Sequence, residues 1–133
     1  MESRLLEKLN TNQREAVLHT EGPLLILAGA GSGKTRVITH RIAYLVKEKM
    51  VPPYRIFAVT FTNKACEEMK KRIVDIIGPT GEGVFIKTFH SASVYLLRRY
   101  GREIGIPGNF TIYDRSDQES LIKQILLDMK LDP

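Results

Sequence analysis

The chain has 133 residues, 43% hydrophobic and 26% charged, which is typical of a globular domain and excludes a disordered or fibrous protein. It has neither a run of 18 apolar residues nor an apolar core near its start, so we expect no membrane contact and a cytoplasmic location. A single cysteine, Cys66, excludes an internal disulfide, and the net charge of +5 fits either a polyanionic partner or a generic basic surface.

The first expected elements are a short helix and a strand. Asn10 can cap a helix that runs to about His19, and Gln13 can reach back to Asn10, three residues earlier. The residues 21–23, Glu-Gly-Pro, break this helix. The apolar run 24–28 follows and predicts a strand that is buried on both faces, as parallel strands usually are.

A glycine-rich segment, residues 28–35, lies between this strand and the next expected helix. Its sequence AGAGSGKT approximates the phosphate-loop pattern G-x-x-x-x-G-K-[ST], with Ala28 in place of the first glycine. Gly29, Gly31 and Gly33 supply the conformational freedom that such a loop needs. The alternative interpretation is a glycine-rich turn with no ligand.

The two residues that end this segment carry the chemistry of a nucleotide site. Lys34 can reach the β- and γ-phosphates, and the Thr35 hydroxyl can ligate Mg²⁺. Backbone N–H groups of the loop and of the following helix terminus would hold the phosphates.

Strands and helices alternate along the rest of the chain. We expect helices over 34–49, 62–77 and 91–101, strands over 56–61 and 84–89, and a last helix opened by a capping box over 116–119. This alternation predicts an α/β fold with a parallel sheet flanked by helices. A composition shift near 105–109 suggests two parts, residues 1–105 and 106–133.

Four blocks together resemble the UvrD/PcrA/Rep-type superfamily 1 DNA helicases, and most closely the PcrA branch. The blocks are LNTNQREA (9–16), AGAGSGKTRV (28–37), VTFTNKA (59–65) and TFHS (88–91), in family order, and the likeness covers residues 9–133. It implies a RecA-like P-loop NTPase motor domain with a partial parallel sheet, and a helical inserted subdomain beginning in 106–133. The function that it implies is ATP-dependent DNA unwinding in repair or replication.

The resemblance also implies a site for ATP and Mg²⁺. Its residues are Gln13, Ala28, Gly29, Ala30, Gly31, Ser32, Gly33, Lys34, Thr35 and Arg36, with Lys34 and Thr35 as the catalytic pair and Thr35 on the metal. Gln13 would read adenine through its amide, although its residue type fits a helix cap equally. Arg36 would pack on the adenine face, or it is a solvated helix charge.

Contacts to single-stranded DNA are implied at the ends of two strands. The residues are Phe61, Thr62 and Asn63 after one strand, and Thr88, Phe89 and His90 at the next. Phe61 offers a face for base stacking, but as the end of an apolar strand it also fits core packing. His90 has a structural alternative, and Arg98 and Arg99 fit either backbone contacts or an exposed helix face.

The family's hydrolysis needs a carboxylate pair and arginines from a second motor domain. Asp75 and Asp114 are the candidates weighed for the carboxylates, and neither precedes a second acid in a D-E pattern. We therefore expect the N-terminal piece of a motor, cut at Pro133, that exposes apolar surface and neither hydrolyses ATP efficiently nor unwinds DNA. The remainder of the motor would be its partner. The alternatives are a self-contained phosphotransferase, a non-enzymatic nucleic-acid-binding module, and a motor from a helicase–nuclease complex.

Overall fold

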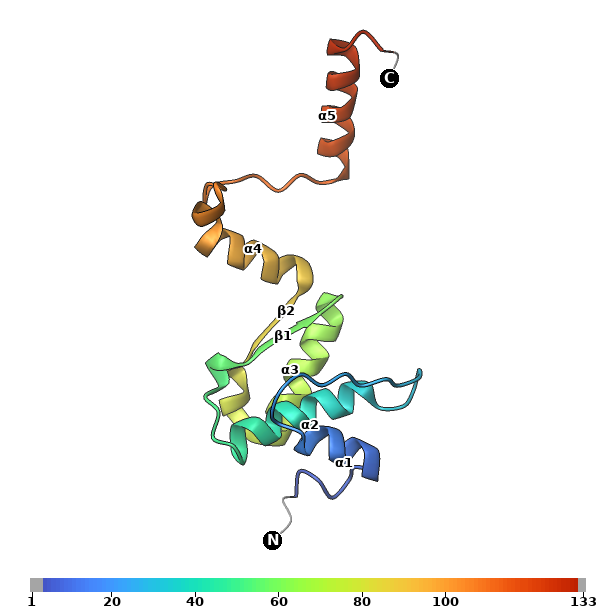
Figure 1. Ribbon diagram of the computed structural model, residues 1–133, viewed down its shortest axis with the longest axis vertical. Coiled ribbons are helices and arrows are strands. Elements are labelled where there is room, and N and C mark those ends of the chain that lie inside the picture. Colours follow the sequence, from blue (N-terminus) through green and yellow to red (C-terminus); the bar gives the residue numbers. More distant parts are fainter. Residues whose placement is uncertain (1–3, 132–133) are drawn as a thin grey trace. The chain divides into compact units, whose positions relative to one another are not determined.

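The computed structural model describes residues 4–131 (Figure 1). The chain divides into two compact units between Ala92 and Ser93. The elements in chain order are α1 (Thr11–Leu18), α2 (Lys34–Lys47), η1 (Pro53–Arg55), β1 (Phe57–Thr60), α3 (Asn63–Ile77), η2 (Gly78–Gly83), β2 (Phe85–Thr88), α4 (Phe89–Tyr100), η3 (Gly101–Ile104) and α5 (Arg115–Asp128). No helix among these residues is long and apolar enough to cross a membrane.

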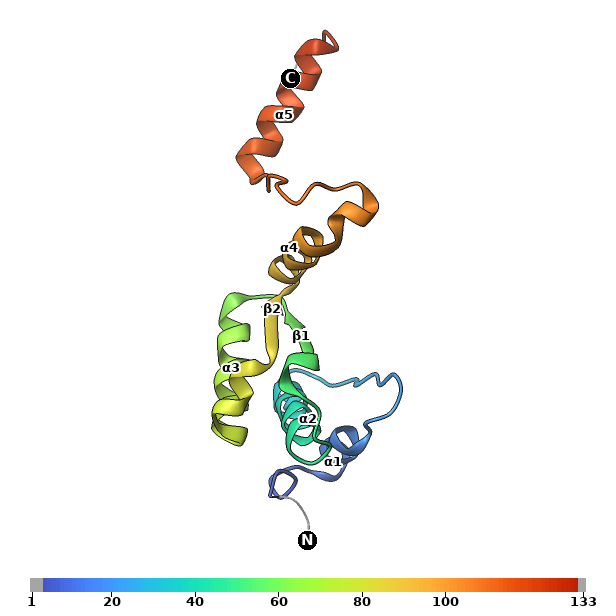
Figure 2. The same ribbon diagram turned by 90° about the vertical axis from the view of Figure 1, so that its left-hand side faces the viewer.

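The sheet of the first unit consists of two parallel strands in the part of the chain that the structure describes. β1 pairs with β2 in a register that joins Phe57 to Phe85 and Thr60 to Thr88. The connection runs through α3, which lies along the two strands (Figure 2), because parallel strands need a long crossover. The expected parallel sheet with flanking helices is therefore confirmed for these two strands.

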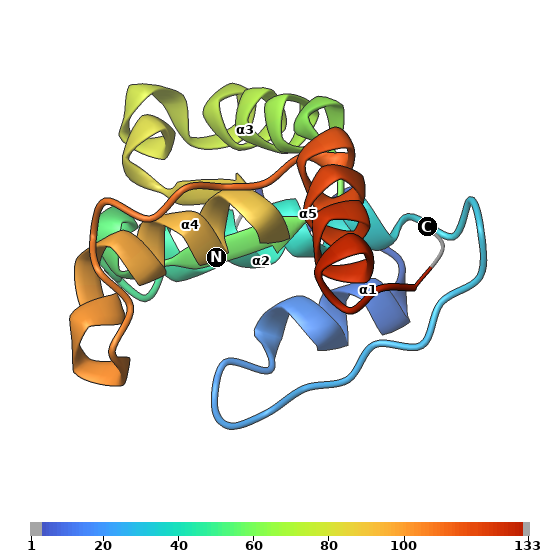
Figure 3. The ribbon, with the colours of Figure 1, turned by 90° about the horizontal axis from the view of Figure 1, so that it is seen from above.

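Helix α2 packs between α1 and α3, and each contact buries its own apolar cluster (Figure 3). The α2–α3 cluster, which also includes the residue before β2, consists of Ile42, Ala43, Val46, Met69, Ile73, Ile77 and Val84. The smaller cluster, on the α1 side, consists of Leu6, Leu9, Val17 and Val37. Apolar residues at helical spacing on two faces of α2 thus hold the first unit together.

The predicted strand over residues 24–28 is wrong for this structure. The segment lies in no sheet among the described residues, and Leu25 and Leu27 are 80% and 87% exposed. Ile26 alternates with them and packs against the α1–α2 cluster. A strand needs a hydrogen-bonded neighbour, and the two described strands pair only with each other. The expected exposure of apolar surface is therefore present here.

The helix starts follow local capping chemistry, with two corrections. Thr62 caps α3, because its side chain accepts a hydrogen bond from the N–H of Ala65 at 3.1 Å. Both strands are shorter than the predicted ranges 56–61 and 84–89. Phe61 therefore lies beyond the end of β1, and Phe89 begins α4 instead of ending β2. Both aromatic residues therefore lie just past the strand ends.

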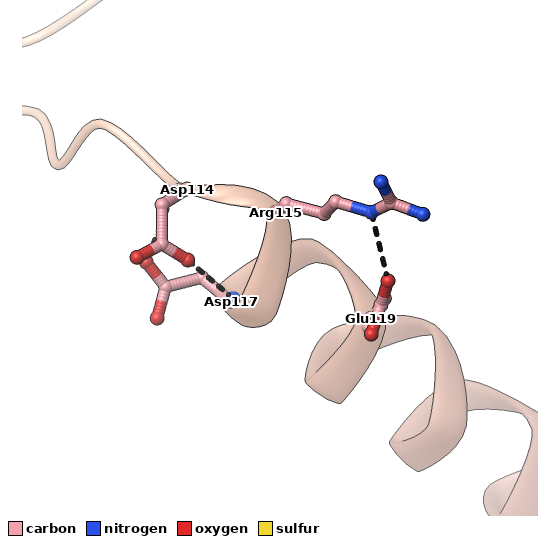
Figure 4. A network of polar contacts seen from close by, with 4 residues as sticks. All are labelled: Asp114, Arg115, Asp117 and Glu119. Carbon is pink, nitrogen blue, oxygen red and sulfur yellow. Dashed lines mark hydrogen bonds and ion pairs between the residues drawn. The ribbon is translucent and has the colours of Figure 1, made fainter.

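In the second unit, α5 begins with a different cap from the predicted one (Figure 4). Asp114 accepts a hydrogen bond from the N–H of Asp117 at 2.9 Å, and the Asp117 carboxylate accepts one from the N–H of Asp114 at 3.0 Å. The box predicted over 116–119 is wrong because Asp114 offers an equivalent box two residues earlier. Asp114 is thus a capping residue, and Asp75 lies within α3.

Candidate nucleotide site and nucleic-acid surface

The glycine-rich loop leads into α2 through a left-handed residue. Gly33 is the N-cap of α2 with φ of 86°, and Gly31 has φ of 74°, a region that side chains other than glycine avoid. Because this N-cap is a glycine, it has no side chain to bond the first turn of α2. Its first N–H groups and the positive end of its dipole therefore remain available to an anion such as phosphate.

The Lys34 side chain folds back over this loop. Its Nζ donates to the carbonyl oxygens of Ala28 at 2.9 Å and Gly29 at 3.2 Å. Ser32 closes the same turn, because its hydroxyl and its N–H both donate to the carbonyl of Gly29. The ammonium group thus lies where the loop would receive negative charge, although the side chain is exposed and can turn outward.

Gln13 joins α1 to the loop. Its backbone N–H donates to Asn10 Oδ1 at 2.9 Å, and its Oε1 accepts from the Asn10 N–H at 3.1 Å, which confirms the predicted capping box. Its Nε2 donates to the carbonyl of Ser32 at 3.1 Å. A Cβ placed on Gly33 would lie 2.7 Å from that Nε2 and would displace the amide, while the φ of 86° is what favours glycine here.

A cavity of about 300 Å³ lies between α1, the loop and α2, within the size range of small-molecule sites. It is lined by Asn10, Asn12, Gln13, Ala16, Ile26, Leu27, Ala28, Gly29, Ser32, Lys34 and Val37. The structure therefore brings five of the predicted nucleotide residues into one wall: Gln13, Ala28, Gly29, Ser32 and Lys34. Sequence reasoning missed Asn12 and Ala16, although the spacing from 12 and 13 to 16 places all three on one face of α1.

The other predicted nucleotide residues do not line this cavity. Ala30 and Gly31 are exposed in the loop, and Gly33 lies beneath the Gln13 amide. Thr35 is the second residue of α2, and no described residue hydrogen-bonds its hydroxyl. Arg36 lines a separate groove beside α3.

The residues present suit a magnesium ion beside bound phosphates. The Thr35 hydroxyl is a hard oxygen ligand in the first turn of a helix whose N-terminus lacks a side-chain cap. Mg²⁺ is usually held by few protein ligands together with water and phosphate oxygens, so the Thr35 hydroxyl would supply one ligand among several.

A second group of predicted residues meets at the carboxyl ends of the strands. The rings of Phe61 and Phe89 lie 5.0 Å apart between centroids, tilted by 41°, and they are 87% and 47% exposed. The parallel pairing of Thr60 with Thr88 brings the two rings to one edge of the sheet. The core-packing alternative for Phe61 is therefore wrong, and the pair presents an aromatic surface to solvent.

The polar residues at this edge differ in what they offer. The Thr62 hydroxyl is used by the cap of α3. Thr88 is buried, and its hydroxyl donates to Ser91 Oγ and accepts from the Ser91 N–H. Asn63 and His90 are exposed in the first turns of α3 and α4. The side chains of Asn63 and His90 are open to a ligand, whereas the hydroxyls of the two threonines are used in the turns.

Arg98 and Arg99 contact aromatic residues of the second unit. The Arg98 guanidinium lies 5.1 Å from the ring centroid of Phe110, and that of Arg99 lies 5.8 Å from the centroid of Tyr100. A side-chain hydrogen bond with Tyr100, and then interactions with Tyr95, raise the pKa of Arg99.

Comparison with known proteins places these features in one family. The family profile described as "UvrD/REP helicase N-terminal domain" matches residues 9–133. The ATP-dependent DNA helicase PcrA of Staphylococcus aureus is 57% identical over 128 residues, 96% of this chain and 18% of the relative. The protein of the same name from Bacillus subtilis is 57% identical over 131 residues, 98% of this chain and 18% of the relative. The chain thus spans 18% of the length of these relatives.

Proposed function

Because the chain belongs to the UvrD/REP helicase family, we propose that it forms the ATP-binding and single-stranded-DNA-contacting part of a DNA helicase motor. The observation that carries the proposal is the cavity that both Gln13 and Lys34 line, each bonded to a carbonyl of the glycine-rich loop. In this proposal the first unit is part of a RecA-like P-loop domain and the chain acts in the cytoplasm. Residues 1–105 form the motor part, and 106–133 begin a helical subdomain.

The nucleotide would lie with its base toward α1 and its phosphates on the loop. Asn12, Gln13 and Ala16 line the α1 side of the cavity, where an amide can pair with the donor and acceptor edge of adenine. Lys34 would exchange its bonds to the loop carbonyls for bonds to the β- and γ-phosphates. Thr35 would hold Mg²⁺, which neutralises phosphate charge when it is bound.

Single-stranded DNA would cross the edge of the sheet where the strands end. The exposed pair of Phe61 and Phe89 supports base stacking, which contributes about 1–3 kcal/mol per base. Asn63, His90 and the N-terminus of α3 lie beside this pair and would contact the phosphate backbone. Of the predicted DNA residues, Thr62 and Thr88 would act through the turns that they hold.

Hydrolysis would depend on groups that the cavity wall does not supply. No Asp or Glu is among the residues that line it, whereas phosphoryl transfer needs a group that positions the attacking water and cations that stabilise the transition state. We therefore expect this chain to bind ATP without efficient turnover or unwinding. A motor with the length of the relatives would supply the remaining groups.

The test is Mg²⁺-ATP hydrolysis by the purified chain, with and without single-stranded DNA, beside its Lys34→Ala variant. Nucleotide binding without turnover above that variant is the expected result. DNA-stimulated turnover that the variant loses would show that these residues suffice for hydrolysis. Turnover with a small acceptor and no DNA would favour a phosphotransferase instead, and DNA binding with no effect of ATP and no ATP binding would leave only a nucleic-acid-binding module.

A further inference from the structure

A groove of about 470 Å³ lies on the α3 side of α2, away from the nucleotide cavity. Its walls include Lys8 from the segment before α1, Arg36 and His40 from α2, and Arg72 and Asp75 from α3. The two helices lie side by side in Figure 3. The spacing from 36 to 40 and from 72 to 75 directs both pairs toward the same groove, and all five residues belong to the first unit.

The charges that line this groove are not neutralised within the protein. Lys8, Arg36 and Arg72 contribute three positive charges against the one negative charge of Asp75, with histidine counted as neutral. In the part of the chain that the structure describes, no hydrogen bond or ion pair engages these four side chains. Like charges around a concave surface raise its potential, and an anion relieves their repulsion.

An ion pair elsewhere on α3 offers a comparison with the charges of the groove. There Lys70 pairs with Glu82 at 2.8 Å, so that its positive charge is already matched by the protein. The groove has no such match, although Asp75 is part of its wall.

Polar groups at the base of the groove are already ordered. The hydroxyl of buried Thr39 lies 3.0 Å from the carbonyl oxygens of both Thr35 and Arg36, and so is used inside α2. His40 Nδ1 lies 2.8 Å from the carbonyl oxygen of Arg36, which can only accept, so Nδ1 carries the proton. This bond holds the imidazole and leaves its Nε2 for a ligand.

We propose that this groove binds a terminal phosphate group, either free hydrogen phosphate or a small phosphate ester that carries hydroxyl groups. Two arginine forks and a lysine suit a doubly charged oxyanion. Asp75 can only accept hydrogen bonds, so it favours a ligand that also carries an O–H donor, which hydrogen phosphate does and sulfate does not. A backbone phosphodiester of nucleic acid has one charge and no such donor, and it suits the groove less well.

The site is tested by nuclear magnetic resonance on the labelled chain, with phosphate, sulfate and ribose 5-phosphate titrated at constant ionic strength. We expect saturable shifts of the amides over 36–40 and 72–76 with phosphate or ribose 5-phosphate, and weaker binding of sulfate. Tighter binding of phosphate would identify a free anion as the ligand, and tighter binding of ribose 5-phosphate an ester. In Arg72→Gln the affinity should fall about tenfold, the effect of losing one charge-assisted hydrogen bond.

Two variants control this test. Arg55→Gln removes one charge from an exposed arginine that does not line the groove, and it should bind phosphate like the parent chain. Asp75→Asn should bind both anions but lose the preference for phosphate over sulfate. Shifts confined to the glycine-rich loop, equal losses in Arg72→Gln and Arg55→Gln, binding of an oligonucleotide alone, or a sulfate affinity equal to that of phosphate would each overturn the proposal.

Discussion

The amide of Gln13 makes two bonds at once: Oε1 accepts from the N–H of Asn10 at 3.1 Å, and Nε2 donates to the carbonyl of Ser32 at 3.1 Å. One side chain thereby caps α1 and tethers the glycine-rich loop. An adenine that used the same amide would have to replace at least one of these bonds. If Gln13 binds adenine as proposed, nucleotide binding would therefore be coupled to the cap of α1.

Replacing Gln13 by Glu separates these two roles. The carboxylate keeps an acceptor for the Asn10 N–H, but it places a negative charge against the Ser32 carbonyl. We expect a melting temperature close to that of the parent chain and weaker ATP binding, measured by thermal unfolding and calorimetry. Gln13→Ala should also lose the bond from the Asn10 N–H, while the bond from the backbone N–H of residue 13 to Asn10 Oδ1 remains, so the cost should be about 0.5 kcal/mol of stability. A Gln13→Glu chain that binds ATP like the parent would contradict the proposed role of the amide.

Lys34→Ala should abolish measurable nucleotide binding and leave the fold intact. The ammonium bonds only two loop carbonyls and is exposed, so its removal buries no unsatisfied group, while a charge-assisted phosphate contact of about 1.5–3 kcal/mol is lost. Calorimetry with ATP and Mg²⁺ measures this loss. Lys47→Ala, in the last turn of the same helix, is the matched control and should bind normally. Retained affinity in Lys34→Ala would refute the phosphate assignment.

Phe61→Ala should weaken binding of single-stranded DNA by about 1–3 kcal/mol without changing its salt dependence, because stacking is lost rather than charge. Since Phe61 is 87% exposed, the melting temperature of the Phe61→Ala variant should be close to that of the parent chain. Fluorescence anisotropy of a labelled oligonucleotide over a range of salt concentrations measures both quantities. Phe57, which stacks on Phe85 at the start of the strands, provides the control variant Phe57→Ala. Equal losses in the two variants would argue against an aromatic site at the strand ends.

Gly81→Ala should destabilise the first unit by about 1–3 kcal/mol through overpacking. A Cβ at this position would lie 2.9 Å from Ile73 Cγ2 and 3.2 Å from the backbone nitrogen of Val74, in the core of the unit. Gly29→Ala is the control for thermal unfolding, because its Cβ would meet nothing within 4 Å. Unchanged stability in Gly81→Ala would mean that η2 moves away from α3 without cost.

The sequence predicted those features that depend on neighbouring residues. The capping box of Asn10 and Gln13 is correct because it is local chemistry within four residues. The start of α5 was misplaced because two boxes compete two residues apart, and Asp114 forms the one that is used. The predicted strand over 24–28 failed because an apolar run indicates burial but does not provide a strand partner.

In the candidate site, too, the sequence predicted local features but not contacts between residues far apart in the chain. The glycine-rich motif predicted that Lys34 lies at the loop. The spacing of the motif could not show that Gln13 reaches Ser32, which is 19 residues away in the sequence. Nor could it show that Arg36 lines the groove beside α3, since that depends on how α2 packs. The predicted roles of Gln13 and Arg36 at adenine remain predictions.

The segment 24–28 has a further consequence for how the protein moves. Its backbone lies outside any sheet ladder, and it is attached through Ile26 and through the loop contacts of Gln13 and Lys34. Amide hydrogens there should exchange with solvent far faster than those of α3, whose residues Met69 and Ile73 belong to the main core. The segment that leads into the glycine-rich loop is thus less protected than α3, and ligand binding at the loop would show as slower exchange there.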